Sequence, residues 1–452
     1  MNDKKIHLRE RDIPDHWYNL AADLPNALQP PRNPGSLEPL RPEEMTPLFA
    51  EALVEQEISS ERWIPIPEAV RAAYSVWRPT PMIRATGLEA ALETPAEIWY
   101  KWEGVSPAGS HKPNSAIPQA YYNAREGVRR LTTETGAGQW GSSLSYACAQ
   151  FGLACHIYMV RVSFNQKPYR ASMMRTWGAT VHPSPSDQTE TGKRILAEDR
   201  DNNGSLGIAI SEAVEEALAG EDVHYALGSV LNHVLLHQTV VGQEFRKQME
   251  MVDRWPDVMV GCVGGGSNFG GFAFPFMSEV LDGGKATRFV AVEPAACPTL
   301  TRGRIAYDFG DTVGLTPLIR MHTLGSGFMP PGIHTGGLRY HGMAPLVSAA
   351  VEQGIVEPIA IGQLDAFAAG LLFARTEGIV PAPEANHAVH GAILEAERCR
   401  AESRKEVIAF NLCGHGHMDM SAYDAYLGNQ LQDVPHDEQA LALALSHLPK
   451  VG

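Results

Sequence analysis

The feature that most constrains the fold is an alternation, from residue 97 onward, of short apolar runs with longer helical periods. Strands that alternate with helices form parallel sheets covered by helices on both faces. The sequence therefore predicts an α/β protein. The strand-like runs are 97–103, 155–160, 257–263, 288–292 and 406–410, and the helical candidates are 113–129, 143–151, 236–252, 363–377 and 384–402.

The chain has 452 residues, which is too long for one compact core. We expect residues 1–92 to be an N-terminal extension packing on the core, because their proline-rich stretches are typical of an extended arm. Within this extension, Pro42 and the two glutamates after it predict a short helix. The rest divides into two α/β domains of comparable size, 93–240 and 241–452.

Composition argues against several classes of protein. The formal net charge of −15 disfavours nucleic acid or an anionic membrane as the main partner. No apolar run reaches the roughly 18 residues that span a bilayer. The six cysteines are dispersed without a CxxC pair, so neither a disulfide framework nor a zinc ribbon is indicated. We expect a cytoplasmic protein, with no membrane or nucleic-acid partner.

Lys112 lies between a predicted strand at 97–103 and a helix that Pro113 opens. A lysine at such a junction sits beside the positive end of the helix, which lowers the pKa of its amine and attracts anions. That position suits an amine that forms an imine with a carbonyl cofactor. Taken alone, the motif also fits a solvated surface lysine.

A run of three glycines follows the strand predicted at 257–263 and precedes a helix expected from near Phe269. Glycines let successive backbone N–H groups converge on one anion, with the helix dipole behind them. The spacing is neither that of a dinucleotide fold nor that of a nucleotide P-loop. The run predicts a cup for a phosphate monoester, with a tight packing turn as the alternative. Its residues are Gly264, Gly265, Gly266, Ser267 and Asn268, the last two adding side-chain donors.

A third segment places Glu134 at a strand end, before a turn rich in donors. The turn is suited to holding a carboxylate through backbone amides, and Glu134 to acid and base catalysis. A helix-capping loop with a surface glutamate is the alternative. An imine-forming lysine, a phosphate cup and a carboxylate cup together fit pyridoxal phosphate chemistry on amino acids. The turn consists of Thr135, Gly136, Ala137, Gly138 and Gln139.

With these motifs the chain resembles a tryptophan synthase beta chain, one of the fold-type-II pyridoxal-phosphate enzymes, from about residue 75 to 427. The likeness implies two doubly wound domains with the active site between them. The long N-terminal arm resembles the second, standalone-type subfamily. The motifs are His-Lys-x-Asn at 111–114, Glu-Thr-Gly-Ala-Gly-Gln at 134–139, Gly-Gly-Gly-Ser-Asn at 264–268 and Glu-Gly-Ile-Val-Pro-Ala-x-Glu at 377–384.

The resemblance implies a role for each motif. Lys112 forms the imine with pyridoxal 5'-phosphate, and His111 with residues 264–268 surrounds the cofactor phosphate. Residues 135–139 hold the substrate carboxylate, and Gln139 also contacts the cofactor. Glu134 assists loss of the serine hydroxyl and the proton transfers around indole.

Two further residues are implied at the cofactor ring. Glu384 lies near the ring, and Cys413 lies against the pyridine nitrogen. A thiol cannot keep that nitrogen protonated as an aspartate would, so the ring is a weaker electron sink and β-elimination is favoured over transamination. A small buried apolar residue is the alternative for Cys413.

At three positions the sequence differs from the principal beta chains, and these differences leave the identity of the amino-acid donor and of the acceptor undecided. Trp140 stands where those chains have histidine, and His415 replaces their usual arginine. Residues 325–331 contain no aspartate to help close the site over serine. L-serine, a phosphorylated or otherwise activated serine, and a different acceptor remain as alternatives, and coupling to an alpha subunit is equally open.

The function expected is β-replacement that makes L-tryptophan from L-serine, or an activated serine, and indole. An L-serine or L-threonine deaminase of the same fold and a non-catalytic subunit that binds pyridoxal phosphate or an amino acid are the alternatives. The family likeness also implies a homodimer and a monovalent cation held by backbone carbonyls, and it leaves an alpha subunit open as a partner, because members of the second subfamily often are not built to couple with one. No transition-metal site is expected, since His387, His390, His415 and His417 lack a clear carboxylate complement. Glu293 is expected to be structural.

Overall fold

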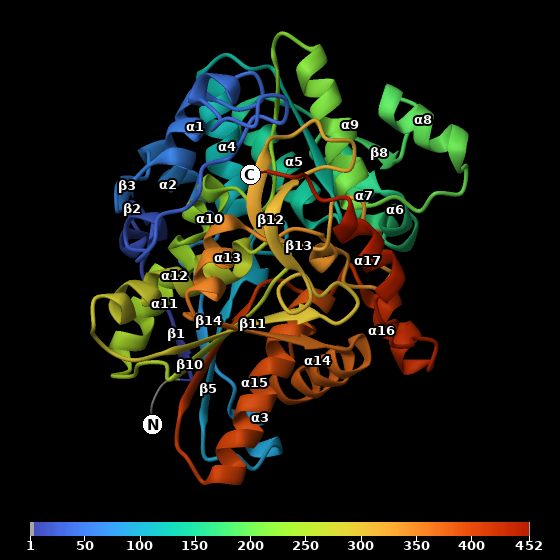
Figure 1. Cartoon of the computed structure of the whole chain (residues 1–452). Helices are drawn as coiled ribbons and strands as arrows, with labels where there is room; N and C mark the ends of the chain where they lie inside the picture. The colour runs from blue at the N-terminus through green and yellow to red at the C-terminus, as the bar shows by residue number, and fades with distance from the viewer. Residues whose placement is uncertain (1–3, 452) are drawn as a thin grey trace.

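Two sheets form the centre of the computed structural model, which describes residues 4–451. The smaller sheet lies in the upper half of Figure 1 and the larger sheet below it. In spatial order the larger sheet has strands β1 (Lys5–Ile6), β4 (Met82–Arg84), β5 (Glu97–Trp102), β15 (Val407–Leu412), β10 (Val258–Cys262), β11 (Arg288–Pro294) and β14 (Val356–Ile361). The smaller has β8 (Thr180–Ser184), β7 (Ala154–Val160), β6 (Arg130–Thr135) and β9 (Val223–Tyr225).

Parallel pairing dominates both sheets. Strands β5, β15, β10, β11 and β14 run parallel, as do all strands of the smaller sheet. Only β4 and β1 are added antiparallel, at one edge. The α/β prediction is therefore confirmed. Two antiparallel pairs lie outside these sheets: β2 (His16–Tyr18) with β3 (Trp63–Pro65), and β12 (Arg304–Phe309) with β13 (Leu318–Thr323).

Helices cover both faces of the larger sheet because its central strands are apolar on both sides. Along β10, Val258 and Val260 share a core with α15, whereas Met259 faces the core that contains α12. The helices are α1 (Glu51–Ile58), α2 (Glu68–Tyr74), α3 (Thr86–Ala91), α4 (Pro113–Arg125), α5 (Gln139–Phe151), α6 (Arg161–Gln166), α7 (Pro168–Thr176), α8 (Glu190–Glu198), α9 (Leu206–Ala219), α10 (Asn232–Gln238), α11 (Val240–Met251), α12 (Ser267–Leu281), α13 (Pro345–Glu352), α14 (Gln363–Glu377), α15 (Pro383–Glu402), α16 (Met420–Leu427) and α17 (Glu438–Ser446).

Four helix predictions were wrong in their bounds, and one of these helices is α4, which ends at Arg125 and not at residue 129. Helices α5 and α12 start earlier than expected because Gly138 and Gly266, with φ of 95° and 103°, turn the chain directly into the helix. The single helix expected at 236–252 is two helices, α10 and α11. Thr239 lies between them, where its Oγ1 donates to the Leu236 carbonyl at 2.7 Å and accepts the Tyr18 N–H at 3.0 Å.

The N-terminal region is built more deeply into the molecule than an extended arm would be. Trp17 and Tyr18 are fully buried, and β1 and β4 extend the larger sheet. Strand β5 also belongs to that sheet, because it is buried on both faces and pairs with β15. The boundary expected near residue 240 therefore does not separate the two sheets, and the domain division stays a proposal.

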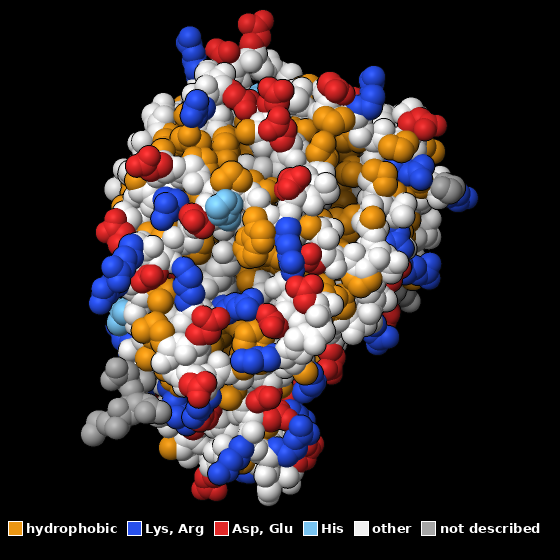
Figure 2. All heavy atoms as spheres, turned by 90° about the vertical axis from the view of Figure 1, so that its left-hand side faces the viewer, with side chains coloured by type: hydrophobic (Ala, Val, Ile, Leu, Met, Phe, Trp, Pro, Cys, Tyr) orange, Lys and Arg blue, Asp and Glu red, His pale blue; other side chains and the backbone are white. Residues whose placement is uncertain are grey.

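Apolar side chains are exposed on the face shown in Figure 2, where they gather in the upper half that contains α1, α2 and β3. In this part of the chain, Ile58 at the end of α1, Trp63 in β3 and Val76 shortly after α2 are 56%, 50% and 64% exposed. None of the helices within residues 4–451 combines the length and the apolar character that a membrane crossing requires.

The predicted site segments all lie at or after the carboxyl ends of parallel strands. Lys112 comes after β5, Glu134 is the last residue but one of β6, the glycine run follows β10 and Cys413 follows β15. Ligands of open α/β sheets bind at this edge. Since β6 belongs to the smaller sheet and the other three strands to the larger, the segments meet between the two sheets.

Candidate active site

Lys112 occupies the predicted position, directly before Pro113 opens α4. Its Nζ donates to the Gly228 carbonyl at 2.9 Å and lies 6.0 Å from the centre of the Trp140 ring. Burial lowers the pKa of the Lys112 amine, against the opposing effect of the Glu134 carboxylate. The amine is therefore easier to deprotonate than a surface lysine, as imine formation requires.

A buried network of charges supports the first turn of α4. Arg78 donates to Glu103 at 2.9 Å, to Glu244 at 2.8 Å and to Asn114 Oδ1 at 2.7 Å. Lys101 donates to Glu244 at 2.8 Å. The two positive and two negative side chains balance and are all fully buried. Directional bonds to Asn114 thus fix the start of the helix next to Lys112.

Two cavities meet at Lys112. One, of about 480 Å³, is lined by the glycine run and by polar side chains. The other, of about 1030 Å³ including its opening, is mainly apolar and reaches Glu134. The residues common to both are Lys112, Gln139, Ser229, Gly265 and Gly337.

The glycine run forms a bend that Ser267 and its neighbours brace. The Ser267 N–H donates to Ser229 Oγ and its hydroxyl to the Gly228 carbonyl, both at 3.1 Å. Asn268 Nδ2 donates to the Cys262 carbonyl at 3.0 Å, so this amide holds the bend together. The loop with Gly228 and Ser229 was missed from the sequence, although a Gly-Ser pair between a strand and a helix was the available signal.

His111 presents an unpaired nitrogen beside this cavity. The imidazole is buried, its Nδ1 lies 3.4 Å from the Cys413 carbonyl, and its Nε2 has no hydrogen-bond partner among residues 4–451. Burial lowers the pKa of His111 to about 3, so the ring is neutral. Buried ring nitrogens normally have partners. An orphaned nitrogen next to a glycine bend therefore fits a ligand with phosphate oxygens.

Glu384 and Cys413 line the same cavity. Glu384 accepts hydrogen bonds from Gln139 Nε2 at 2.8 Å and from the Gly337 N–H at 2.9 Å. Cys413 Sγ lies 3.7 Å from Cys262 Sγ, and this contact together with burial raises the pKa of the Cys413 thiol. The thiol is therefore uncharged, as its predicted place against a neutral pyridine nitrogen requires.

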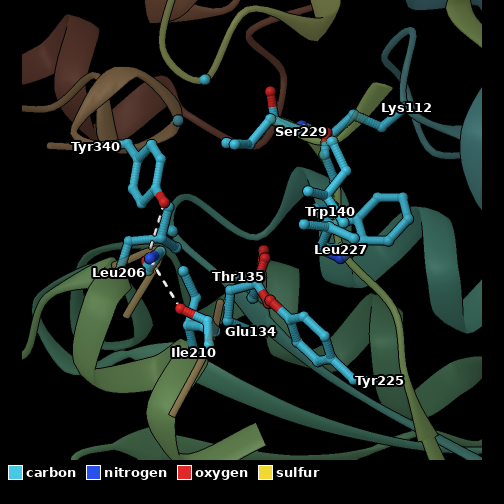
Figure 3. Close-up of a pocket in the computed structure, with 18 of the residues that line it drawn as sticks. Lys112, Glu134, Thr135, Trp140, Leu206, Ile210, Tyr225, Leu227, Ser229 and Tyr340 are labelled. Carbon is cyan, nitrogen blue, oxygen red and sulfur yellow. Dashed lines mark hydrogen bonds between the residues drawn. The ribbon is translucent and has the colours of Figure 1, made fainter. Parts of the chain in front are cut away.

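Glu134 faces the apolar cavity from the end of β6 (Figure 3). Burial raises the pKa of its carboxyl to about 7, although a hydrogen bond from Tyr225 Oη at 2.5 Å opposes that shift. A carboxyl with this pKa both donates and accepts protons near neutrality. Tyr225 was missed from the sequence, because the pairing of β9 with β6 that brings it to Glu134 leaves no local signal.

The turn after Glu134 is rigid and closely packed. Thr135 Oγ1 accepts the Gly141 N–H at 3.1 Å, which closes the turn onto α5. A Cβ placed on Gly138 would lie 2.8 Å from Arg170 Cβ, so only glycine fits there. Gly136 similarly approaches the Gly336 carbonyl, which a Cβ would meet at 2.7 Å.

Aromatic and aliphatic side chains form the rest of the apolar cavity (Figure 3). Trp140 Nε1 donates to Thr133 Oγ1 at 2.7 Å, which fixes the indole ring in the wall. Tyr340 Oη donates to the Gly310 carbonyl at 2.9 Å on the opposite side. The labelled apolar lining residues are Trp140, Leu206, Ile210, Tyr225, Leu227 and Tyr340.

The remaining sequence candidates lie outside this chemistry. Glu293 accepts the Leu300 N–H at 2.8 Å and the Thr301 N–H at 2.9 Å, which agrees with a structural role. His415 packs against Gly109 and stacks on His417 with ring centres 4.4 Å apart. No group of three side chains able to ligate a metal occurs within residues 4–451.

Comparison with known proteins first defines the class. Residues 74–414 match a family model described as "Pyridoxal-phosphate dependent enzyme". Among solved structures, a fungal L-serine ammonia-lyase from Rhizomucor miehei aligns with a TM-score of 0.58 over 78% of this chain and 98% of its own, at 18% identity. At that identity the likeness extends to the fold alone. The family model therefore shows that the chain is a pyridoxal-phosphate-dependent enzyme.

Curated relatives identify the family more closely. Proteins named "Tryptophan synthase beta chain 2" from Thermotoga maritima and Aquifex aeolicus are each 57% identical, over 92% and 95% of this chain and 99% and 100% of their own. The one from Methanosarcina mazei is 55% identical over 96% of this chain and 98% of its own. The chain belongs to the tryptophan synthase beta chain family, and pyridoxal phosphate is its cofactor.

Proposed function

We propose that this enzyme makes L-tryptophan by β-replacement, joining the side-chain carbon of L-serine to indole. The observation that carries the proposal is the large apolar cavity, because it joins the cofactor cavity at Lys112 and contains the acid–base group Glu134. A bicyclic aromatic acceptor needs such a space, whereas water does not.

Pyridoxal phosphate supplies an aldehyde that links to amines and a ring that withdraws electrons from the substrate Cα. We propose that Lys112 carries the link and that the glycine bend with Ser267 holds the phosphate. With the single proton of its neutral ring on Nε2, and not on the Nδ1 that lies 3.4 Å from the Cys413 carbonyl, His111 would donate to a phosphate oxygen, and this orphaned nitrogen would gain a partner. Asn268 braces the bend, and Glu384 with Cys413 lies along the ring.

The turn after Glu134 orients the substrate, and Lys112 carries out the first proton transfer. Backbone N–H groups of residues 135–139, at the positive end of α5, hold the substrate carboxylate. Once the serine amine has replaced Lys112 in the link, the freed Lys112 Nζ removes the proton from the serine Cα and later returns it. Burial favours this exchange because it lowers the pKa of the amine.

Glu134 carries out the proton transfers at the serine hydroxyl and at indole. Its carboxyl donates a proton to the departing serine hydroxyl and then, as a carboxylate, accepts the proton that indole loses. A pKa of about 7 keeps both forms populated. Apolar walls such as Leu206 and Ile210 exclude water, so indole is the favoured nucleophile.

A deaminase of the same fold is the rival activity. A product assay with serine, with and without indole, separates the two. Tryptophan formed when indole is present supports the proposal, whereas keto acid as the sole product under both conditions contradicts it. Repeating the assay with phosphoserine at constant enzyme identifies the amino-acid donor.

Lys112→Ala tests the enzyme assignment against a non-catalytic binding subunit. The variant should lose both the near-visible cofactor absorbance and tryptophan formation. Lys405→Ala, which removes an exposed lysine, is the control and should keep both. Full turnover by the Lys112 variant would show that the lysine is wrongly assigned.

The proposal extends to assembly and location. We propose a homodimer, supported by the exposed apolar side chains of Ile58, Trp63 and Val76, with light scattering as the test.

All six cysteines in the described chain are free and buried, which suits the cytoplasm. An alpha subunit is tested by adding one to the assay, and a monovalent cation by comparing rates in potassium, sodium and cesium salts.

A further inference from the structure

Part of the wall of the apolar cavity comes from the N-terminal region. Residues 30–49, here called the arm, contribute Pro31, Met45, Leu48 and Phe49 to its lining. The last three are buried, with exposures of 6%, 7% and 5%. A segment far from every catalytic motif in sequence therefore lines the same cavity as Lys112.

Backbone bonds hold both ends of the arm. At one end, Arg32 and Leu318 exchange hydrogen bonds of 2.8 and 3.0 Å, which attaches the arm to β13. At the other end, the Tyr225 N–H donates to the Leu48 carbonyl at 2.9 Å, which attaches it to β9. The arm thus bridges the β12–β13 pair and the smaller sheet, and its backbone is attached at both ends.

Phe49 links this wall to the reacting groups. Its ring centre lies 5.9 Å from that of Tyr225, at an interplanar angle of 57°. Tyr225 in turn donates to Glu134. A substituent on an aromatic acceptor that pointed toward the arm would therefore meet Phe49 close to the acid–base carboxyl.

We propose that the arm determines which aromatic acceptors the enzyme takes, with Phe49 as the main specificity-determining residue and Met45 and Leu48 beside it. The inference rests on the proposed function, since it assumes an aromatic acceptor in this cavity. The walls are apolar and closely packed, so they discriminate by shape. Truncating Phe49 leaves an apolar void that an added ring substituent can fill.

The test compares indole with a series of monomethyl indoles. Each compound carries a single methyl group, at a different free carbon of the six-membered ring. In Phe49→Ala, kcat/KM for at least one methylindole should rise relative to indole by roughly 10-fold or more, the scale of discrimination by one methylene in an apolar pocket. Met45→Ala should favour a different ring position. Leu24→Ala removes a buried leucine of the same N-terminal region that does not line the cavity, and it should leave the ratios unchanged.

Dissociation constants of the same indoles, measured without an amino-acid donor, distinguish failure of this inference from failure of the proposed function. Wild-type protein that binds indoles but makes no tryptophan contradicts the proposed function, while the binding ratios still test the arm. Ratios in Phe49→Ala equal to those of wild type and of Leu24→Ala overturn the inference. Should Phe49→Ala not fold, Phe49→Leu makes the same comparison with a smaller void.

Discussion

Removing the hydroxyl of Tyr225 should shift the pH dependence of the enzyme. Tyr225→Phe deletes the hydrogen bond of 2.5 Å to Glu134 Oε2 and little else, because the ring stays in the wall. Burial already raises the pKa of Glu134 to about 7, and this bond opposes the shift. Without the donor the carboxylate is less stable relative to its protonated form, so the pKa rises further.

The size of the shift follows from the strength of such a bond. A hydrogen bond to a charged group contributes about 1.5–3 kcal/mol, which corresponds to a pKa rise of roughly 1–2 units. The pKa of Glu134 should then move from about 7 to roughly 8–9. At pH 7 the carboxylate fraction would fall from about half to between roughly a tenth and a hundredth.

The assay is the pH profile of kcat/KM for indole, because Glu134 must be a carboxylate to accept the indole proton. The acidic limb should move up by the same interval, and the rate at pH 7 should fall about 5- to 50-fold. Well above the new pKa the variant and wild type should converge. An unshifted limb, or a loss of rate that is equal at every pH, would refute the assignment of Glu134 as the proton acceptor.

Three further changes test other parts of the site. Gly138→Ala should raise KM for the amino-acid donor at least 10-fold, since its φ is 95° and the new Cβ meets Arg170; an unchanged KM would argue against this turn as the carboxylate site. Lys101→Met should lower the free energy of unfolding by about 3–5 kcal/mol, because it leaves Glu244 short of a buried partner, and urea titration measures it. Cys413→Ser should keep the reaction within about 10-fold, since a hydroxyl is also uncharged beside the ring; formation of pyridoxamine phosphate would contradict that role.

Local periodicity was sufficient to predict the parallel sheets. Apolar runs such as 257–263 and 288–292 became β10 and β11, because strands buried on both faces leave a continuous apolar signal. The break at Thr239 was not predictable, since it depends on a bond to Tyr18, more than two hundred residues earlier. The burial of Trp17 was missed because the many prolines of this region also suggest an exposed arm.

The same distinction applies to the site: some of its residues lie in local sequence motifs, and others reach it only through contacts between distant segments. Lys112, Glu134 and the glycine run follow strand ends in short motifs, so their positions were predictable. Tyr225 reaches Glu134 only through the pairing of two strands, and Phe49 reaches the cavity only because the arm crosses it. Sequence motifs identify the residues that we propose to contact the cofactor and the amino acid, whereas the apolar cavity proposed for the acceptor is built by tertiary contacts.

The balanced charges behind α4 have a consequence for how this enzyme can diverge. Arg78, Lys101 and Glu103 lie within one stretch of the chain, whereas Glu244 comes from α11, and replacing any one of the four leaves an unpaired opposite charge in the interior. Substitutions there are tolerated only when partners change in concert. In proteins that diverge from this chain, these four charged residues should be retained together or replaced together, even though none of them lines the two cavities.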